Sequence, residues 1–206
     1  MMEEKVPRMN SKPVNLLQII SVQILILLFV TACSDSFEEG MKAYKNSDYR
    51  KAYDKLISHA KKGNPEAQVI IGEIFDKGRG AIQDMGKAAG WYRKAAEQGQ
   101  VVGQYNLGVM YHKGEGIKQD FAEAVNWYGR AAEQQYALAQ FSLGVAHVNG
   151  EGVEKDYIQA KMWFHLAAEN GYANIDNEKV EEYLSEEEIE EALRLAEEWM
   201  GEHQEK

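Results

Sequence analysis

Residues 101–136 read VVGQYNLGVMYHKGEGIKQDFAEAVNWYGRAAEQQY, and their framework recurs 36 residues earlier and 36 residues later. The fixed columns of this copy are Gly108, Gly114, Gly116, Asp120, Trp127, Tyr128, Ala131, Ala132 and Glu133. A fixed period of this length indicates a stacked array of helical units, in which each unit contacts only its neighbours. Because such arrays usually present extended surfaces to other proteins, the period points toward binding.

Each copy predicts two helices separated by a glycine turn. In the copy that starts at residue 64, Asn64 and Pro65 begin a helix, and apolar residues follow at helical spacing. Gly72 lets a neighbouring helix approach closely, while Gly78 and Gly80 end the helix. The recurrence of Gly-x-Gly favours a turn over a dinucleotide-binding loop, which needs a preceding strand and a third glycine.

The second helix of each copy is expected to begin at an aspartate. Asp120 and Asp156, like Asp84 before them, are suited to cap a helix N-terminus. Glu123 and Gln159 stand three residues after two of these aspartates and predict capping boxes. The aromatic pairs at residues 91–92, 127–128 and 163–164 are expected to fill the core between units.

The chain divides into seven expected segments. Residues around Asp48 and Ala52 keep the register of the repeat without its Gly-x-Gly turn, which is typical of a terminal unit. Ser185 with Glu188 predicts a capping box that begins a sealing helix. In chain order the segments are a signal peptide (1–32), a lipidated N-terminus with a short tether (33–36), a degenerate first repeat (37–63), three full repeats (64–100, 101–136 and 137–172) and acidic C-terminal capping helices (173–206).

The net charge of −10 is concentrated at one end of the chain. Residues 173–206 carry thirteen acidic and three basic side chains, so the preceding part of the chain is close to neutral. Nucleic-acid binding needs a basic stripe, and this distribution argues against it. The acidic end is most simply a solvated helix face.

The N-terminal part has the layout of a secretory signal. Residues 14–30 are mostly Leu, Ile and Val, with basic residues before them and Thr31-Ala32 after them. The stretch Val30-Thr31-Ala32-Cys33 resembles the bacterial lipobox, in which the cysteine is lipidated and anchors the protein to a membrane. Ser34 then indicates an outer-membrane protein that faces the periplasm. An uncleaved transmembrane anchor is the alternative, and Met9 competes with Met1 as the start.

The repeated motifs resemble the Sel-one-like repeat (SLR), a relative of the tetratricopeptide repeat. The residues that carry the resemblance are the segments Tyr105–Tyr111 and Ala124–Glu133, and the similarity extends over about residues 37–172. It implies an all-α, right-handed α/α superhelix of about four helical hairpins plus a C-terminal capping helix. It also implies an adaptor or scaffold rather than an enzyme. Ala81, Gln135 and His147 depart from the family pattern.

No catalytic or metal-binding set is predicted, and no cofactor is expected. Ser58 and Lys61 fit Ser-x-x-Lys, but the further motifs of penicillin-recognising enzymes are absent from the sequence. No two histidines stand four residues apart, as a helical metal site requires. His147 is expected to pack in the core in place of a tyrosine.

The sequence therefore predicts a lipid-anchored envelope solenoid that binds a protein or peptide through its first helices. The candidate binding residues, expected to face away from the core, are Ile70, Glu73, Lys77, Asn106, Val109, Lys113, Ser142, Val145 and Asn149. Ile70, Val109 and Val145 are expected to form an apolar track across the copies. Two alternatives are an immunity or inhibitor lipoprotein that neutralises an envelope toxin or hydrolase, and a β-lactamase-like or peptidoglycan-related enzyme.

Overall fold

The computed structural model describes residues 36–172 and 177–203, apart from the side chains of residues 177 and 178. The predictions on the signal peptide and on Cys33 therefore lie outside the described residues. Within the described ranges the regular structure is all helical. A leading helix (residues 36–45) precedes α2 (Tyr49–Lys61), α3 (Pro65–Lys77), α4 (Met85–Glu97), α5 (Val101–Lys113), α6 (Phe121–Ala132), α7 (Ala137–Asn149), α8 (Tyr157–Glu169), α9 (Asn177–Glu181) and α10 (Glu186–His203).

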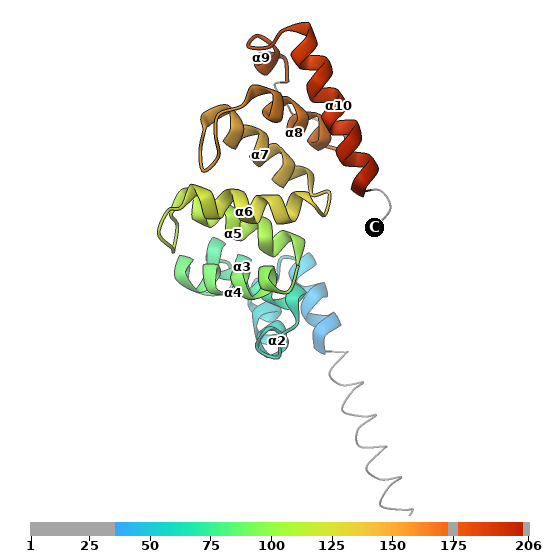
Figure 1. The fold of residues 1–206 in the computed structure, drawn as a ribbon. Helices are drawn as coiled ribbons and strands as arrows, with labels where there is room; N and C mark the ends of the chain where they lie inside the picture. Colours follow the sequence, from blue (N-terminus) through green and yellow to red (C-terminus); the bar gives the residue numbers. More distant parts are fainter. Residues whose placement is uncertain (1–35, 173–176, 204–206) are drawn as a thin grey trace, which may run out of the picture.

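The helices stack in chain order into an all-α solenoid, as predicted (Figure 1). Each of the three full copies is a hairpin of two helices: α3 with α4, α5 with α6, and α7 with α8. We call α3, α5 and α7 the first helices and α4, α6 and α8 the second helices. None of the described helices is long and apolar enough to cross a membrane.

The predicted helix starts are confirmed. The Asn64 side chain accepts a hydrogen bond from the Ala67 N–H at 2.8 Å, and Asp84, Asp120 and Asp156 each accept from the N–H three residues on. The predicted capping boxes after Asp120 and Asp156 are wrong. The N–H of Asp120 donates to the Tyr111 carbonyl oxygen at 3.0 Å, so it is not available to Glu123. The N–H of Asp156 is likewise taken by the His147 carbonyl oxygen.

The first fixed glycine of each copy admits an aromatic ring from the second helix of the same hairpin. A Cβ atom at Gly72 would lie 2.7 Å from the ring of Tyr92, and Gly108 and Tyr128 repeat this contact. Tyr92 and Tyr128 are only 1% and 4% exposed, so the second aromatic of each pair belongs to the core, as expected.

The Gly-x-Gly turn joins one unit to the next. Gly78 ends α3 with a φ of +64°, a left-handed conformation that L side chains rarely adopt. A Cβ atom at Gly80 would lie 2.5 Å from the Tyr49 carbonyl, in the first turn of the preceding unit's second helix. Gly116 and Gly152 make the equivalent contacts one and two units later. The turn is therefore a packing element, as the sequence predicts.

A column of buried glutamines also joins the units, and the sequence analysis did not single it out. The amide nitrogen of Gln68 donates to the Ala60 carbonyl oxygen at 3.1 Å, while its oxygen accepts from the Gln98 amide at 2.7 Å. Gln104 and Gln140 repeat this arrangement in the next two copies. The 36-residue recurrence of a polar residue at a core position was the signal that could have found it.

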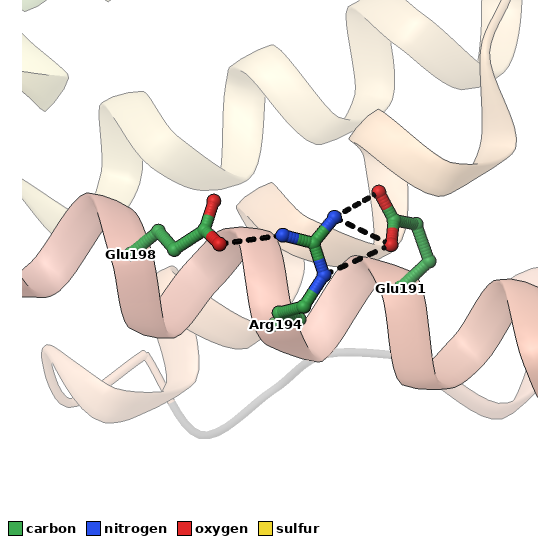
Figure 2. A network of polar contacts seen from close by, with 3 residues as sticks. All are labelled: Glu191, Arg194 and Glu198. Atoms are coloured by element: carbon green, nitrogen blue, oxygen red, sulfur yellow. Dashed lines mark hydrogen bonds and ion pairs between the residues drawn. The ribbon is translucent and has the colours of Figure 1, made fainter.

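The helix α10 seals the C-terminal end of the array. It packs on α8 through Ala192 and Ala196, both 0% exposed, and it begins with the predicted capping box between Ser185 and Glu188. On its outer side Arg194 is held by Glu191 and Glu198 of the same helix (Figure 2).

Candidate functional site

The expectation that Ile70 is exposed is wrong. Its side chain is 6% exposed and lies in the same buried cluster as Ala43 of the leading helix. One turn further along α3, Glu73 accepts a hydrogen bond from Tyr44 of the leading helix. The leading helix therefore covers this side of α3, whereas the equivalent Asn106 and Ser142 are half-buried.

The expected apolar track loses Ile70 to the core, and its other two members, Val109 and Val145, are half-buried. Val109 is half-buried and packs against the core cluster that contains Tyr128 and Leu143. Val145 is half-buried against the cluster that contains Phe164. Both valines thus contribute to packing, because each first helix lies between the second helix of its own unit and that of the preceding unit.

The other candidate residues lie on one surface, which we call the first-helix surface. Lys77, Lys113 and Asn149 are exposed, one at the C-terminal end of each first helix. Ser142 donates to the Leu138 carbonyl oxygen at 2.9 Å and lies beside the hydroxyls of Tyr105 and Tyr128. By residue, the surface comprises Glu73, Lys77, Asn106, Val109, Lys113, Ser142, Val145 and Asn149.

Aromatic pairs that the sequence analysis missed adjoin this surface. Tyr105 and Tyr136 pack edge to face with ring centroids 5.3 Å apart, and the equivalent Phe141 and Tyr172 lie 4.7 Å apart. All four side chains are half-buried. The sequence signal was the replacement of the polar Asn64 and Gln100 by tyrosine at the start of the later units.

Three tyrosines from different units, Tyr136 among them, have pKa values that the charge of one carboxylate influences. Burial raises the pKa of Tyr44, Tyr92 and Tyr136, and the negative charge of Glu73 raises each pKa further. Tyr92 also approaches Asp76, its Oη lying 3.5 Å from a carboxylate oxygen. These tyrosines stand 29, 19 and 63 residues from Glu73 in the chain, so no local pattern could have grouped them.

Ser58 and Lys61, the residues of the Ser-x-x-Lys match, are both exposed on α2. Within the described residues no group of three or more His, Cys, Asp or Glu side chains could hold a metal ion. His147 is half-buried, and its Nδ1 atom is buried without a hydrogen-bond partner. Burial lowers the pKa of His147.

Comparisons with known proteins agree with this geometry. Residues 65–100, 101–136 and 137–172 each match the Sel1 repeat, and together they cover about half of the chain. A Sel1 repeat protein of Oxalobacter formigenes is 42% identical with a TM-score of 0.62, over 66% of this chain and 56% of its own.

A second similar structure is a protective antigen of uropathogenic Escherichia coli that displays an SLR fold. It is 36% identical with a TM-score of 0.65, over 77% of this chain and 34% of its own. The chain therefore spans less than two thirds of the length of either relative. No curated protein sequence matches the chain. Sel1 repeat proteins are generally non-enzymatic scaffolds for protein interactions.

Proposed function

Because this chain belongs to the Sel1 repeat family, we propose that it is a lipid-anchored scaffold of the bacterial envelope that binds a protein or peptide partner. The first-helix surface carries the proposal. Its residues change from copy to copy, as Asn106 and Ser142 show in one column, while the glycines and aromatics of the framework stay fixed. A surface selected for one partner is expected to vary in this way on a constant frame.

The sequence alone supports the lipid anchor in this proposal. The apolar run over residues 14–30 and the lipobox-like Val30-Thr31-Ala32-Cys33 support export and lipidation, with the repeats facing the periplasm from the outer membrane. Cells that express the chain should incorporate an alkyne-labelled palmitate into it, and Cys33→Ser should abolish the label. A labelled Cys33→Ser protein would contradict lipidation at this residue and would leave the binding proposal standing.

Site-specific photo-crosslinking in intact cells tests the binding proposal. A crosslinking amino acid replaces Lys113 or Asn149, which are exposed on the first-helix surface. Glu97 and Glu133 are matched controls, since both are exposed and stand at one column, Glu97 as the last residue of α4 and Glu133 as the residue that follows α6. We expect an adduct of the same mass from both first-helix positions and none from the controls. Adducts of equal yield from all four positions would contradict the proposal.

The alternative role as an inhibitor of a basic toxin or hydrolase rests on α10. Its glutamates are largely exposed, and Arg194 is engaged by Glu191 and Glu198 of the same helix. Crosslinkers in place of Glu187 and Glu202 distinguish the two roles. Adducts from α10 alone would favour the inhibitor, whereas adducts from the first-helix surface alone favour the scaffold.

A further inference from the structure

Gln135 departs from the repeat at a place where the backbone favours glycine. The other copies of its column hold Gly63, Gly99 and Gly171, with φ angles of +100°, +84° and +90°. Gln135 has a φ of +59°, so it occupies the left-handed region that residues with a Cβ atom rarely adopt. A glutamine kept in this conformation indicates that its side chain has a role that glycine could not fill.

The side chain of Gln135 fastens the end of a distant helix. Its amide nitrogen donates to the His203 carbonyl oxygen at 3.0 Å, in the last turn of α10. The last carbonyl groups of a helix have no partner within the helix, so Gln135 satisfies one of them from another unit. The bond therefore ties the C-terminal end of α10 to the loop between α6 and α7.

The sequence of α10 explains how this helix reaches so far. Two columns of the repeat continue past residue 172, namely Ala88, Ala124, Ala160 and Ala196, and Trp91, Trp127, Trp163 and Trp199. The two glycine columns of the turn, however, hold Glu186 and Glu188. Without glycines to end a helix, the turn and the second helix of an incomplete fourth unit form one helix of 18 residues. Such a helix is about 27 Å long.

The last turns of α10 lie against Trp163 of α8. Trp199 packs edge to face on Trp163 with ring centroids 5.8 Å apart, and the His203 ring stacks on Trp199 at 3.9 Å. His203 Nδ1 also donates to the Trp199 carbonyl oxygen at 2.8 Å. Gln135 thus holds the residue that forms the outer end of a stack of three rings.

The middle of α10 is held by packing, whereas its end is held by contacts near the surface. Ala192 and Ala196 are fully buried, but Trp199, Met200 and His203 are only half-buried. Local opening of a fold begins where few groups are buried. The end that Gln135 fastens is therefore the part of α10 that can open first.

We propose that α10 is a strap that closes over Trp163, and that Gln135 is the positioning residue that fastens its free end. When the bond to His203 breaks, the last turns of α10 leave Trp163, while Ala192 keeps the start of the helix on α8. The strap is a conformational device of the fold, and it does not depend on which partner the chain binds.

Amide hydrogen exchange of the full chain, purified in detergent, tests the strap. Gln135→Gly removes the bond to α10, and we expect exchange at residues 197–203 to become faster by about fivefold, the factor that one hydrogen bond supplies. Exchange in α6 and α7 should change little. Relief of the left-handed backbone offsets the greater freedom of glycine in the unfolded chain.

Gln135→Arg is the rescue variant, because its long side chain carries N–H donors and should slow exchange at residues 197–203 again. Gln119→Gly is the matched control. The Gln119 amide also donates to a carbonyl near a helix end, that of His112 at 2.8 Å, but within one unit, so exchange in α10 should not change.

Three results would overturn the strap. The first is unchanged exchange at residues 197–203 in Gln135→Gly. The second is equal acceleration along all of α8 and α10, because the C-terminal helix would then open as one body and not from its fastened end. The third is equal exchange in Gln135→Gly and Gln135→Arg, which would assign the effect to the backbone of the loop and not to the side-chain bond.

Discussion

At the scale of single residues, two glycines of one hairpin have opposite roles. A Cβ atom at Gly108 would lie 2.7 Å from the Tyr128 ring, whereas nothing lies within 4 Å of a Cβ atom at Gly129. Gly108→Ala should therefore lower the free energy of unfolding by about 2 kcal/mol through overpacking. Gly129→Ala should raise it by about 0.5–1 kcal/mol, because alanine favours the helix.

Urea unfolding of the two variants measures both effects. The pair is informative because α5 and α6 belong to one hairpin, so both changes report on the same unit. If Gly108→Ala were neutral, the close contact between first and second helix would not be a determinant of the fold.

His147 gives the fold a pH dependence whose sign follows from its burial. The pKa of His147 lies below its ordinary value of 6.5 because burial disfavours the charged imidazolium. Above pH 7.5 the imidazole is neutral in both states, so it contributes no pH dependence. As the pH falls through 6.5, the unfolded chain takes up a proton that the folded chain resists, and stability is lost.

The change His147→Phe should reduce this loss, since phenylalanine occupies the same column at Phe75. The measurement is the difference in the free energy of unfolding between pH 7.5 and pH 5.5. We expect the free energy of unfolding to fall less in the variant than in the wild type over this pH range. The two slopes should differ by less than about 1.4 kcal/mol per pH unit. An unchanged difference would assign the acid sensitivity to other groups.

At the scale of elements, one buried lysine fixes the short helix α9 to α8. The Lys161 side chain is 7% exposed and pairs with Glu181 of α9, whose side chain is 38% exposed. Ala89 and Val125 stand at the same column in the earlier copies, so the charge appears only where α9 covers it. The two partners should respond unequally to substitution, because only the lysine is shielded from water.

Glu181→Ala leaves a buried, unpaired ammonium group and should destabilise the protein by about 2 kcal/mol. Lys161→Met removes the buried charge and releases Glu181 to solvent, so its cost should stay within about 1 kcal/mol. Thermal unfolding of both variants checks that Glu181→Ala destabilises the protein more than Lys161→Met. A larger cost for Lys161→Met would mean that the lysine acts through its packing rather than through the ion pair.

At the scale of the whole molecule, the period of the sequence predicts nearly all of the architecture. Helix starts at Asn64 and Asp84 and the turn at Gly78 depend on local chemistry, so they follow from sequence alone. The burial of Ile70 does not, because it depends on the leading helix, which comes from another unit. The same limit applies to the hydrogen bond from Tyr44 to Glu73, which forms only when the leading helix packs on α3.

Stacking of this kind also predicts how the molecule unfolds. Each unit contacts mainly its neighbours, so the stability of the array is close to a sum of local terms. Ala196→Asp places a charge at a fully buried position between α10 and α8. The resulting loss of stability should be confined to the C-terminal end of the array. Amide hydrogen exchange should therefore become faster in α8 and α10 and change little in α3 and α4. Equal acceleration along the chain would show instead that the units unfold as one cooperative body.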